Sequence, residues 1–236
     1  MNRQNGNMYD FVTHTSNPIK GECPHDCSYC YMKPIYNRYK LNSALRLDMN
    51  ELNCNYGKGK VIFMGSSTDM FASGIPTDWI MQVYDHCLAF DQNHYLFQSK
   101  NPSRFLEPSL INHPFMKRRD IACFATTIET NREQPVVSKA ESMKDRAIAM
   151  QKLREMGFRV MITMEPIMDF DLKEVIAMME FIQPFQINIG CNTSKAVQLP
   201  EPNRQKLIGL IQTLRQHTNL KLKSNISRIL GDLQNI

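Results

Sequence analysis

The sequence predicts an α/β protein in which a parallel sheet, covered by helices, curves into an open or partial barrel. From about residue 60 onward, short β-type runs alternate with amphipathic stretches. Successive runs begin roughly 26 to 38 residues apart, close to the length of one strand-plus-helix unit. About six or seven such units fit a partial barrel better than a complete eight-stranded one. The 236 residues, 42% hydrophobic and 22% charged, form a globular composition in a chain long enough to bury a sizeable core.

Short apolar runs mark the expected strands. They are Val61–Met64, Tyr95–Gln98, Ile121–Ile128, Arg159–Met164, Gln186–Ile189 and, with a weaker pattern, Leu220–Lys223. Active sites of parallel α/β folds lie at the carboxyl ends of the strands. The residues that directly follow each run are therefore the first candidates for function.

Three helices are predicted between these strands from apolar residues that recur every three or four positions. Ser138, with Glu141 three residues later, forms a capping box at the start of the first helix, and Gly157 ends that helix. The apolar stripes are Ala140, Met143, Ala147, Met150, Leu153 and Met156; Leu172, Val175, Ile176, Met179 and Ile182; and Leu207, Leu210, Ile211 and Leu214. We expect these Met-rich stripes to face the core.

We expect a single domain over residues 1–236, with its core from about residue 10 to 205 and a last helix and strand within 203–236. The longest apolar runs have about five residues, far short of the ~20 of a membrane helix, and Met1–Asp10 is too polar for a signal peptide. A soluble, cytoplasmic protein is therefore expected. The net charge of +5 and the pI of 8.8 permit a nucleic acid or an anionic small molecule as partner. The densest basic cluster, Lys117–Arg119, is most simply a solvated loop.

The seven cysteines are an odd number in a chain without an export signal, which argues against a disulfide framework. Cys54, Cys87, Cys123 and Cys191 are scattered, as expected of small core residues. Cys23, Cys27 and Cys30 instead lie together with the spacing C-x3-C-x2-C. Thiolates within one loop can converge on one metal centre, and three ligands to a four-iron cluster leave one iron open for substrate chemistry.

A structural zinc site is the alternative for the three cysteines, with His25 or His14 as the fourth ligand. Zinc sites usually pair two ligand units that lie apart in the sequence, and no second unit follows here. His25 lies inside the cysteine segment itself, where reaching the same ion would be cramped. The spacing therefore favours an iron–sulfur cluster over zinc.

The segment Cys-Pro-His-Asp-Cys-Ser-Tyr-Cys at residues 23–30 resembles the signature of the radical S-adenosylmethionine (radical SAM) superfamily, C-x3-C-x-aromatic-C, with Tyr29 as the aromatic residue. The resemblance implies a partial (β/α)6 barrel whose signature loop follows the first strand, and Phe11–Thr15 is a plausible first strand. It implies that the three cysteines hold a [4Fe–4S] cluster and that SAM chelates the fourth iron.

The resemblance also implies roles for residues that follow the expected strands at Val61–Met64 and Tyr95–Gln98. The sequence lacks the Gly-Gly-Glu run of many members, and its Ser-x-Asp is similar to the branch that includes spore photoproduct lyase. Ser66, Ser67 and Asp69 would then contact the SAM amino group, although a Ser- and Asp-rich turn explains them without a ligand. Lys100 would pair with the SAM carboxylate, or else be solvated.

Alternation after Ile121–Thr126 places Thr127, Glu129 and Asn131 on one face. Polar side chains that point into a barrel mouth need partners, because burying them unpaired is costly. The resemblance implies that Thr127 and Glu129 hold the ribose hydroxyls of SAM. A salt bridge from Glu129 to Arg132 or to a helix is the alternative.

The last two strand ends offer further candidates. Glu165 and Asn188 would point to the same mouth as the residues above. Asp169 or Asp171 is expected to cap the following helix. Cys191 is either a passive small residue or a hydrogen-atom donor close to the substrate.

From about residue 10 to 205 the chain resembles a compact radical SAM group often encoded by phages and their hosts. The turn Gly-Ser-Ser-Thr-Asp at 65–69 contains no cysteine, whereas the lyase carries its hydrogen-donating thiol near that turn. This difference argues against a direct lyase assignment.

The expected function is therefore reductive cleavage of SAM to a 5′-deoxyadenosyl radical that abstracts a hydrogen atom from a substrate. A nucleic acid or nucleotide is the favoured substrate class, and a one-electron donor of the flavodoxin or ferredoxin type is the implied partner. The alternative is a non-catalytic nucleic-acid-binding module stabilised by zinc or an iron–sulfur cluster.

Overall fold

The computed structural model describes residues 1–4, 9–132, 138–194 and 197–231. Its main element is an eight-stranded sheet in the order β1-β2-β5-β6-β7-β8-β9-β10. These strands are β1 (Asn2–Arg3), β2 (His14–Ser16), β5 (Val61–Met64), β6 (His94–Gln98), β7 (Ala122–Thr127), β8 (Arg159–Met164), β9 (Gln186–Ile189) and β10 (Asn219–Leu222). Within this sheet β1 runs antiparallel to β2, and the other neighbouring strands are parallel. A separate antiparallel pair joins β3 (Ile19–Lys20) to β4 (Arg46–Leu47).

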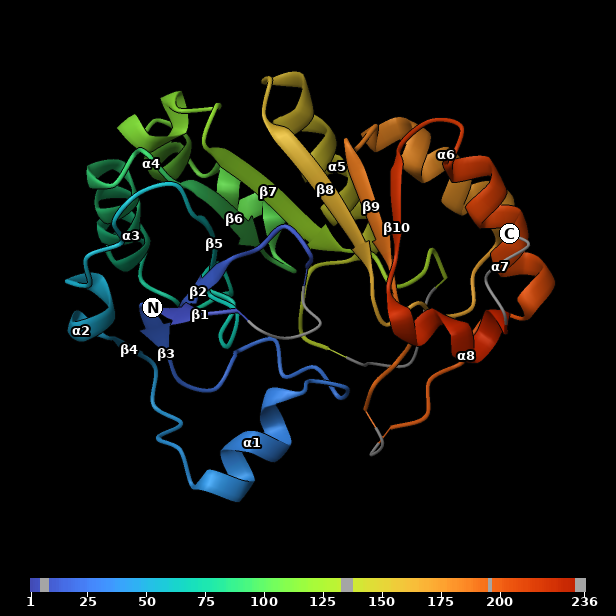
Figure 1. The fold of residues 1–236 in the computed structure, drawn as a ribbon, viewed down its shortest axis with the longest axis horizontal. Helices are drawn as coiled ribbons and strands as arrows, with labels where there is room; N and C mark the ends of the chain where they lie inside the picture. Colours follow the sequence, from blue (N-terminus) through green and yellow to red (C-terminus); the bar gives the residue numbers. More distant parts are fainter. Residues whose placement is uncertain (5–8, 133–137, 195–196, 232–236) are drawn as a thin grey trace.

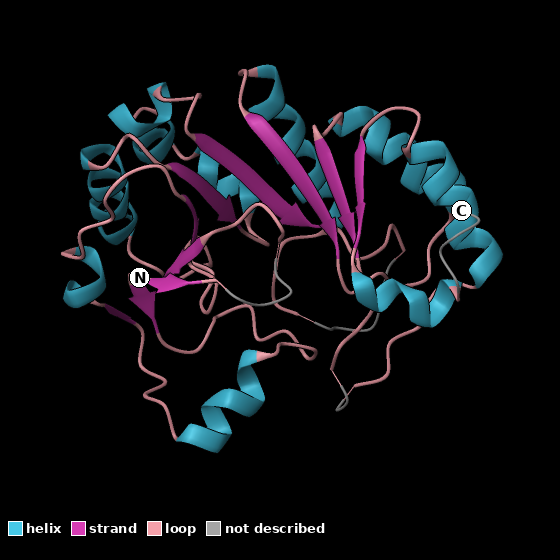
Figure 2. Ribbon diagram, viewed as in Figure 1, coloured by secondary structure: helices cyan, strands magenta, loops and turns pink. Residues whose placement is uncertain are grey.

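The sheet is curved, and most of the helices cover its outer side (Figures 1 and 2). The α-helices are α1 (Met32–Tyr39), α2 (Met49–Leu52), α3 (Thr77–Ala89), α4 (Pro108–Ile111), α5 (Met143–Glu155), α6 (Leu172–Ile182), α7 (Arg204–Leu214) and α8 (Ser227–Leu230). The strands β1 and β10 stand at the two edges of the sheet, which is therefore an open barrel. The predicted fold class is confirmed. In the described part of the chain, the helices are too short or too polar to cross a membrane.

The predicted elements agree closely with the observed ones where apolar runs are continuous. Three of the predicted strands have the bounds of β5, β8 and β9, and the strand expected at the end of the chain is β10, one residue earlier. Val175, Met179 and Ile182 of the second predicted stripe are all buried on α6. Alternating strands and helices therefore bury their apolar sides against one another, as the periodicity predicts.

The predicted start of α5 is wrong. The helix begins at Met143, and Ser142 caps it by accepting a hydrogen bond from the backbone N–H of Asp145 at 3.1 Å. Ser138 instead accepts a bond from the N–H of Ala140 in the preceding turn. Ser142 and Asp145 are three residues apart, as Ser138 and Glu141 are, so both pairs have the spacing of a capping box. Ser142 and Asp145 form the actual cap because they lie directly at the start of the buried helical turns.

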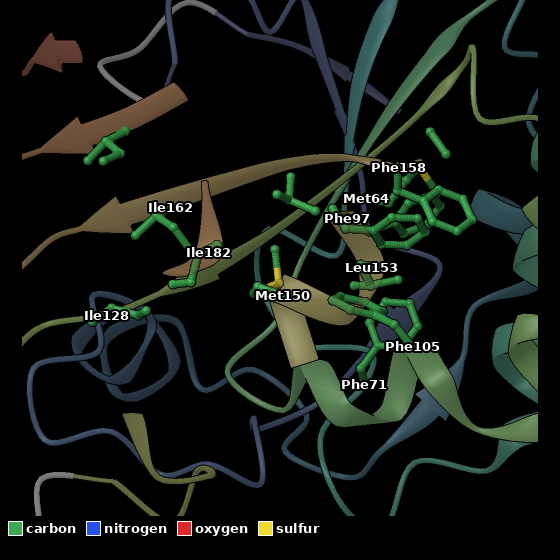
Figure 3. Packing of buried hydrophobic residues seen from close by; sticks show 14 of the residues in the cluster. Met64, Phe71, Phe97, Phe105, Ile128, Met150, Leu153, Phe158, Ile162 and Ile182 are labelled. Atoms are coloured by element: carbon green, nitrogen blue, oxygen red, sulfur yellow. The ribbon is translucent and has the colours of Figure 1, made fainter. Parts of the chain in front are cut away.

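The main hydrophobic core fills the space between the sheet and the outer helices. Figure 3 shows Phe97 and Met64 from the sheet packed near Leu153 of α5 and near Phe71 and Phe105. The rings of Phe71 and Phe105 meet edge to face with centroids 4.5 Å apart. Each such buried side chain contributes about 1.5–3 kcal/mol through removal of apolar surface from water.

A second, smaller core fills the inside of the barrel. The predicted first strand is shifted: β2 begins at His14, and the preceding residues enter the barrel instead. Tyr9 and Val12 pack there against Phe63, Leu96 and Met161. A cavity of about 630 Å³ opens at the amino ends of the strands, where Leu96 is part of its wall. A second cavity opens at the carboxyl ends, where Tyr9 and Phe63 form part of the wall. The small core thus separates the two ends of the barrel.

Candidate functional site

The cavity at the carboxyl ends of the strands has a volume of about 490 Å³ and contains the cysteine segment on one side. Its walls include most of the predicted site residues: Cys23, Cys27, Tyr29, Cys30, Ser66, Ser67, Asp69, Lys100, Thr127, Glu165 and Cys191. Glu129 and Asn188 do not line this cavity. Both are buried next to residues that do: Glu129 binds Lys100, and Asn188 lies beside Thr163 in the register of β8 and β9. The fold therefore brings together residues as far apart in the sequence as Cys23 and Cys191, because the carboxyl ends of all the parallel strands meet at one end of the barrel.

The three cysteines lie in a tight loop that two backbone hydrogen bonds stabilise. The N–H of Asp26 donates to the carbonyl of Cys23, and the N–H of Cys30 donates to the carbonyl of Cys27, each at 3.1 Å. All three thiols are free of disulfides. Burial raises the pKa of Cys23 to about 12 and also raises the pKa of Cys27.

The donor set fits an iron–sulfur cluster. Three soft sulfur ligands share one loop, and the raised pKa values of Cys23 and Cys27 mean that a bound metal must itself stabilise these two thiolates. Within the described ranges, no group of three or more His, Cys, Asp or Glu side chains is arranged to hold a single metal ion. A four-iron cluster is much larger than one ion and holds its thiolates further apart.

His25 fastens the cysteine loop to the ends of β5 and β6. Its Nε2 lies 2.8 Å from Oδ2 of Asp69, and the ring is buried. Asp69 also accepts hydrogen bonds from the N–H of Lys100 at 2.8 Å, from Ser99 Oγ at 2.9 Å and from the N–H of Phe71 at 2.9 Å. Although burial opposes ionisation, these bonds hold the pKa of Asp69 below its ordinary value. The expected contact of Asp69 with a SAM amino group stays a prediction, and that contact would have to share the carboxylate with these donors.

Tyr29 fastens the same loop to the end of β7. Its hydroxyl donates to Oε1 of Glu129, and the ammonium of Lys100 donates to both the Tyr29 hydroxyl and Oε1 of Glu129, the latter at 2.7 Å. Lys100 Nζ also lies 4.3 Å from the centroid of the Tyr29 ring. Tyr29 and Lys100 both line the cavity, and the charge of Lys100 is already paired with that of Glu129.

Arg146 of α5 completes the pairing of Glu129 from the opposite side. Its Nη1 donates to Oε2 of Glu129 at 2.9 Å and to the carbonyl of Thr127 at 2.7 Å, and its Nε donates to the carbonyl of Glu141 at 2.9 Å. Although burial opposes ionisation, Lys100 and Arg146 lower the pKa of Glu129 to about 2. The salt bridge from Glu129 to a helix, expected as an alternative to a contact with ribose, is therefore present. Its expected contact with ribose remains a prediction.

The turn after β5 is held by Asn17. Its Oδ1 accepts bonds from Ser66 Oγ at 3.2 Å and from the N–H of Ser67 at 2.9 Å. Gly65 begins this turn at a φ of +74°, where a side chain would be strained and a Cβ would lie 3.0 Å from the carbonyl oxygen of Thr68. The turn thereby presents both serines to the cavity.

Polar side chains from the barrel interior form the opposite wall. The Tyr9 hydroxyl bonds to Thr163 Oγ1 at 2.8 Å and donates to Gln98 Oε1 at 2.5 Å, and Gln98 Nε2 donates to Thr127 Oγ1 at 3.2 Å. Burial raises the pKa of Tyr9. Lys223 Nζ lies 4.9 Å from the centroid of the Tyr9 ring.

Glu165 is held between Lys223 and the backbone at Gly190. Lys223 Nζ lies 2.5 Å from Glu165 Oε2. A Cβ at Gly190 would lie 2.7 Å from Glu165 Oε1, so only glycine leaves room for this carboxylate. Glu165 therefore faces the cavity as a paired, fixed charge.

Cys191 and Asn188 occupy different environments. Cys191 lines the cavity, and burial raises the pKa of its thiol to about 11. Asn188 accepts a bond from Gln186 Nε2 at 2.9 Å, and its own amide nitrogen is buried without a hydrogen-bond partner among the described residues. Asn188 therefore lies beneath the site and does not form its surface.

The expected capping by Asp169 or Asp171 is wrong. Asp171 occupies the position before α6, but its side chain does not cap the helix. Both carboxylates pair with Arg132, and Asp169 also binds Lys206 Nζ at 2.6 Å. Arg132 is thus paired here and not with Glu129, because two carboxylates lie within its reach.

The basic cluster at 117–119 lies away from the cavity. It precedes Ala122, the first residue of β7, and so lies at the amino end of that strand. Arg118 is paired with Asp91 at 2.6 Å and with Asp120 at 2.7 Å. This cluster is partly neutralised and stands at the opposite end of the sheet from the cysteine loop.

The fold is similar to that of spore photoproduct lyase. One structure of a lyase variant matches with a TM-score of 0.63 at 12% identity, covering 92% of this chain and 78% of the lyase chain. Another, with bound AdoMet and dinucleoside spore photoproduct, matches with a TM-score of 0.60 at 13% identity over 90% of this chain. The chain spans 64% of the length of the lyase in that second structure. No protein-family model and no curated protein sequence matches the chain.

Proposed function

We propose that the chain is a radical SAM enzyme. The observation that carries this proposal is the placement of Cys23, Cys27 and Cys30 on one wall of a cavity at the carboxyl ends of a parallel sheet. The spacing of the cysteines is that of the superfamily signature, and the fold is shared with a lyase whose structure contains bound AdoMet. The cysteine spacing comes from the sequence and the shared fold from the structure, so these two observations are independent of each other.

In this proposal, the three cysteines hold a [4Fe–4S] cluster. When bound, the cluster supplies one electron for cleavage of SAM to methionine and a 5′-deoxyadenosyl radical, which takes a hydrogen atom from the substrate. His25 and Tyr29 fix the loop against Asp69 and Glu129, so that the cysteines keep one orientation relative to the cavity. The chain thus supplies a concave site with a fixed cysteine loop, in which bound SAM and substrate would shield a reactive species from water.

The residues around the cavity divide the recognition of SAM. We assign the amino group of SAM to the turn with Ser66 and Ser67, and its carboxylate to Lys100, a cation on the cavity wall beside the cysteine loop. Glu129 is fully buried and holds Lys100 and Tyr29 in place, so its effect on SAM is exerted through these two neighbours. Thr127 remains the candidate for a direct contact with ribose.

A nucleotide or an extruded base is the favoured substrate class. A cavity of about 490 Å³ has the size of a small-molecule site, and a base within a duplex would have to leave the stack to enter it. The lyase with the same fold has been crystallised with a dinucleoside substrate. Cys191 lies on the cavity wall as a protonated thiol, the state needed to return a hydrogen atom.

Anaerobic reconstitution with iron and sulfide tests the proposal. We expect four iron and four sulfide per chain and formation of 5′-deoxyadenosine from SAM after reduction with dithionite. Cys→Ala at position 23, 27 or 30 should abolish both, whereas the control Cys54→Ala, outside the cavity, should retain both. One zinc per chain without sulfide would instead identify the non-catalytic metal-stabilised module.

A further inference from the structure

The cysteine loop has a cavity on each side. The first is the cavity at the strand ends described above. The second has a volume of about 550 Å³ and is bounded by α1, by Leu45 and by the loop itself, and Cys23, Cys27 and Cys30 line this cavity too. The loop therefore separates the strand-end cavity from an outer cavity next to α1.

The outer cavity lies beside a strongly basic segment. Residues 31–47 contain Lys33, Arg38, Lys40 and Arg46 and no acidic residue. Arg38 and Lys40 are exposed, and neither has a carboxylate partner in the part of the chain that the structure describes. In the adjoining loop, Asp26 is shared by Lys33 at 2.6 Å and Lys139 at 3.2 Å, which leaves the surroundings positive.

The same segment exposes large apolar side chains. At the end of α1, Tyr39 and Leu41 are 62% and 45% exposed. Tyr31, before the start of the helix, is 50% exposed and lines the strand-end cavity instead. Figure 1 shows α1 projecting beyond the carboxyl ends of the strands, away from the sheet. Exposed aromatic and apolar side chains ringed by charge are typical of a surface that binds another protein.

We propose that α1 and the outer cavity form the docking surface for an acidic protein that donates single electrons, of the flavodoxin or ferredoxin type. This inference rests on the proposed function. One electron leaves the reduced carrier, which is oxidised by one equivalent, and enters the cluster held by the cysteines from their outer side. The substrate cavity on the other side of the loop stays closed to the carrier. Arg38 and Lys40 supply the charge complementarity that steers an acidic partner to this face.

A nucleic acid is a less suitable occupant of this surface. Tyr31, directly before α1, lines the strand-end cavity and donates to the carbonyl of Ser66 at 2.6 Å, whereas Arg38 and Lys40 lie at the other end of the helix. A strand held by these two cations would therefore contact the protein roughly 12 Å from that cavity. An electron carrier needs only to approach the cysteine loop, and all three cysteines line the outer cavity.

The double variant Arg38→Gln/Lys40→Gln tests the proposal. The matched control is Lys144→Gln/Lys173→Gln, which removes two exposed cations from α5 and α6 on the outer side of the sheet. Two quantities are measured on reconstituted protein at low salt: the affinity for oxidised flavodoxin, and the rate at which photoreduced flavodoxin bleaches the cluster absorbance. Reduction by dithionite, a small reagent that needs no docking surface, is measured in parallel.

For the α1 variant we expect the affinity for flavodoxin to fall roughly three- to tenfold relative to wild type. The rate at which flavodoxin reduces the cluster should fall by a similar factor. The difference should shrink as salt rises, whereas reduction by dithionite and the control variant should be unchanged. Equal flavodoxin affinity and rate in wild type and the α1 variant would overturn the proposal. Loss of oligonucleotide binding in place of flavodoxin binding would assign the surface to nucleic acid. Failure of the proposed function is distinct, because no cluster would then form in any of these proteins.

Discussion

His25 and Asp69 are joined at 2.8 Å across 44 positions of sequence, and this contact connects the cysteine loop to the ends of two strands. The histidine lies between two of the cysteines, where a zinc ligand is one reading of the sequence. Its ring nitrogen is instead directed to a carboxylate that also binds the backbone of Lys100. The contact thereby places the cysteines relative to the sheet without touching the metal site directly.

Replacing Asp69 with Asn should loosen the loop. An amide would turn an N–H₂ group toward donors that now bond to an oxygen, at a cost of about 1–3 kcal/mol in the free energy of unfolding. We expect iron bound per reconstituted chain to fall as well. Denaturant titration and iron analysis measure the two effects. Asp85→Asn is the control. Asp85 also contacts a histidine, His113, but its side chain is 71% exposed and it takes no part in holding the cysteine loop. Equal losses in both variants would refute a specific role for Asp69.

Glu129 should give the protein a marked acid dependence. Its pKa is lowered from 4.5 to about 2 in the folded state, so it stabilises the fold fully above pH 4.5 and progressively less as the pH falls toward 2. In Glu129→Gln this component of the pH dependence should vanish. The variant should also be less stable at pH 7 by about 3–5 kcal/mol, because Lys100 and Arg146 lose their partner. Urea titrations between pH 2 and pH 7 measure both effects, and parallel pH profiles for the two proteins would contradict the prediction.

Lys100→Met should weaken SAM binding. Loss of a charge-assisted contact of about 1.5–3 kcal/mol corresponds to a roughly 10- to 150-fold rise in Kd. Calorimetric titration of reconstituted protein with SAM measures it independently of turnover. Lys206→Met is the control, because Lys206 pairs with Asp169 and does not line the cavity. An unchanged Kd in Lys100→Met would remove Lys100 from the SAM site.

Two glycines should respond to alanine in different ways. In Gly190→Ala the new Cβ would lie 2.7 Å from Glu165 Oε1, so the carboxylate must move, at a cost of about 1–3 kcal/mol in stability. Gly209 lies within α7, where its Cβ would meet only the flexible end of Leu172 at 3.3 Å. Gly209→Ala should therefore be neutral or stabilising by up to about 1 kcal/mol. Thermal unfolding of the pair tests this, and similar shifts in both would contradict the assigned crowding at Gly190.

The sequence predicts the sheet well because continuous apolar runs such as Arg159–Met164 have few alternatives to a buried strand. Local spacing likewise identifies the cysteine loop. The helices α1 and α3 were not predicted individually. On α1 only Tyr36 is buried, so that helix presents no apolar stripe. On α3 the buried residues Ile80, Val83, Tyr84 and Cys87 do recur at helical spacing, a signal that could have identified this helix.

Partners that are distant in sequence could not be predicted in this way. Arg146 is almost fully buried and pairs with Glu129, and its one local signal is a position three residues after Met143 on the apolar side of α5. Asn17 and Lys223 lie outside any motif, and their contacts with Ser66 and Glu165 arise only when the sheet is assembled. Such pairs depend on tertiary geometry that spacing does not encode.

The segment around Tyr9 and Val12 has a consequence for how the site can change. Because these side chains join Phe63, Leu96 and Met161 of the strands in closing the barrel from within, the depth of the substrate cavity is set in part by a segment outside the strands. A smaller residue at position 9 would deepen the cavity without altering any strand pairing. Such a change would remove the bonds of Tyr9 to Gln98 and Thr163 and so lower stability, but the pairing of the strands would stay the same. The size of the substrate cavity can thus vary at a position outside the sheet that defines the fold.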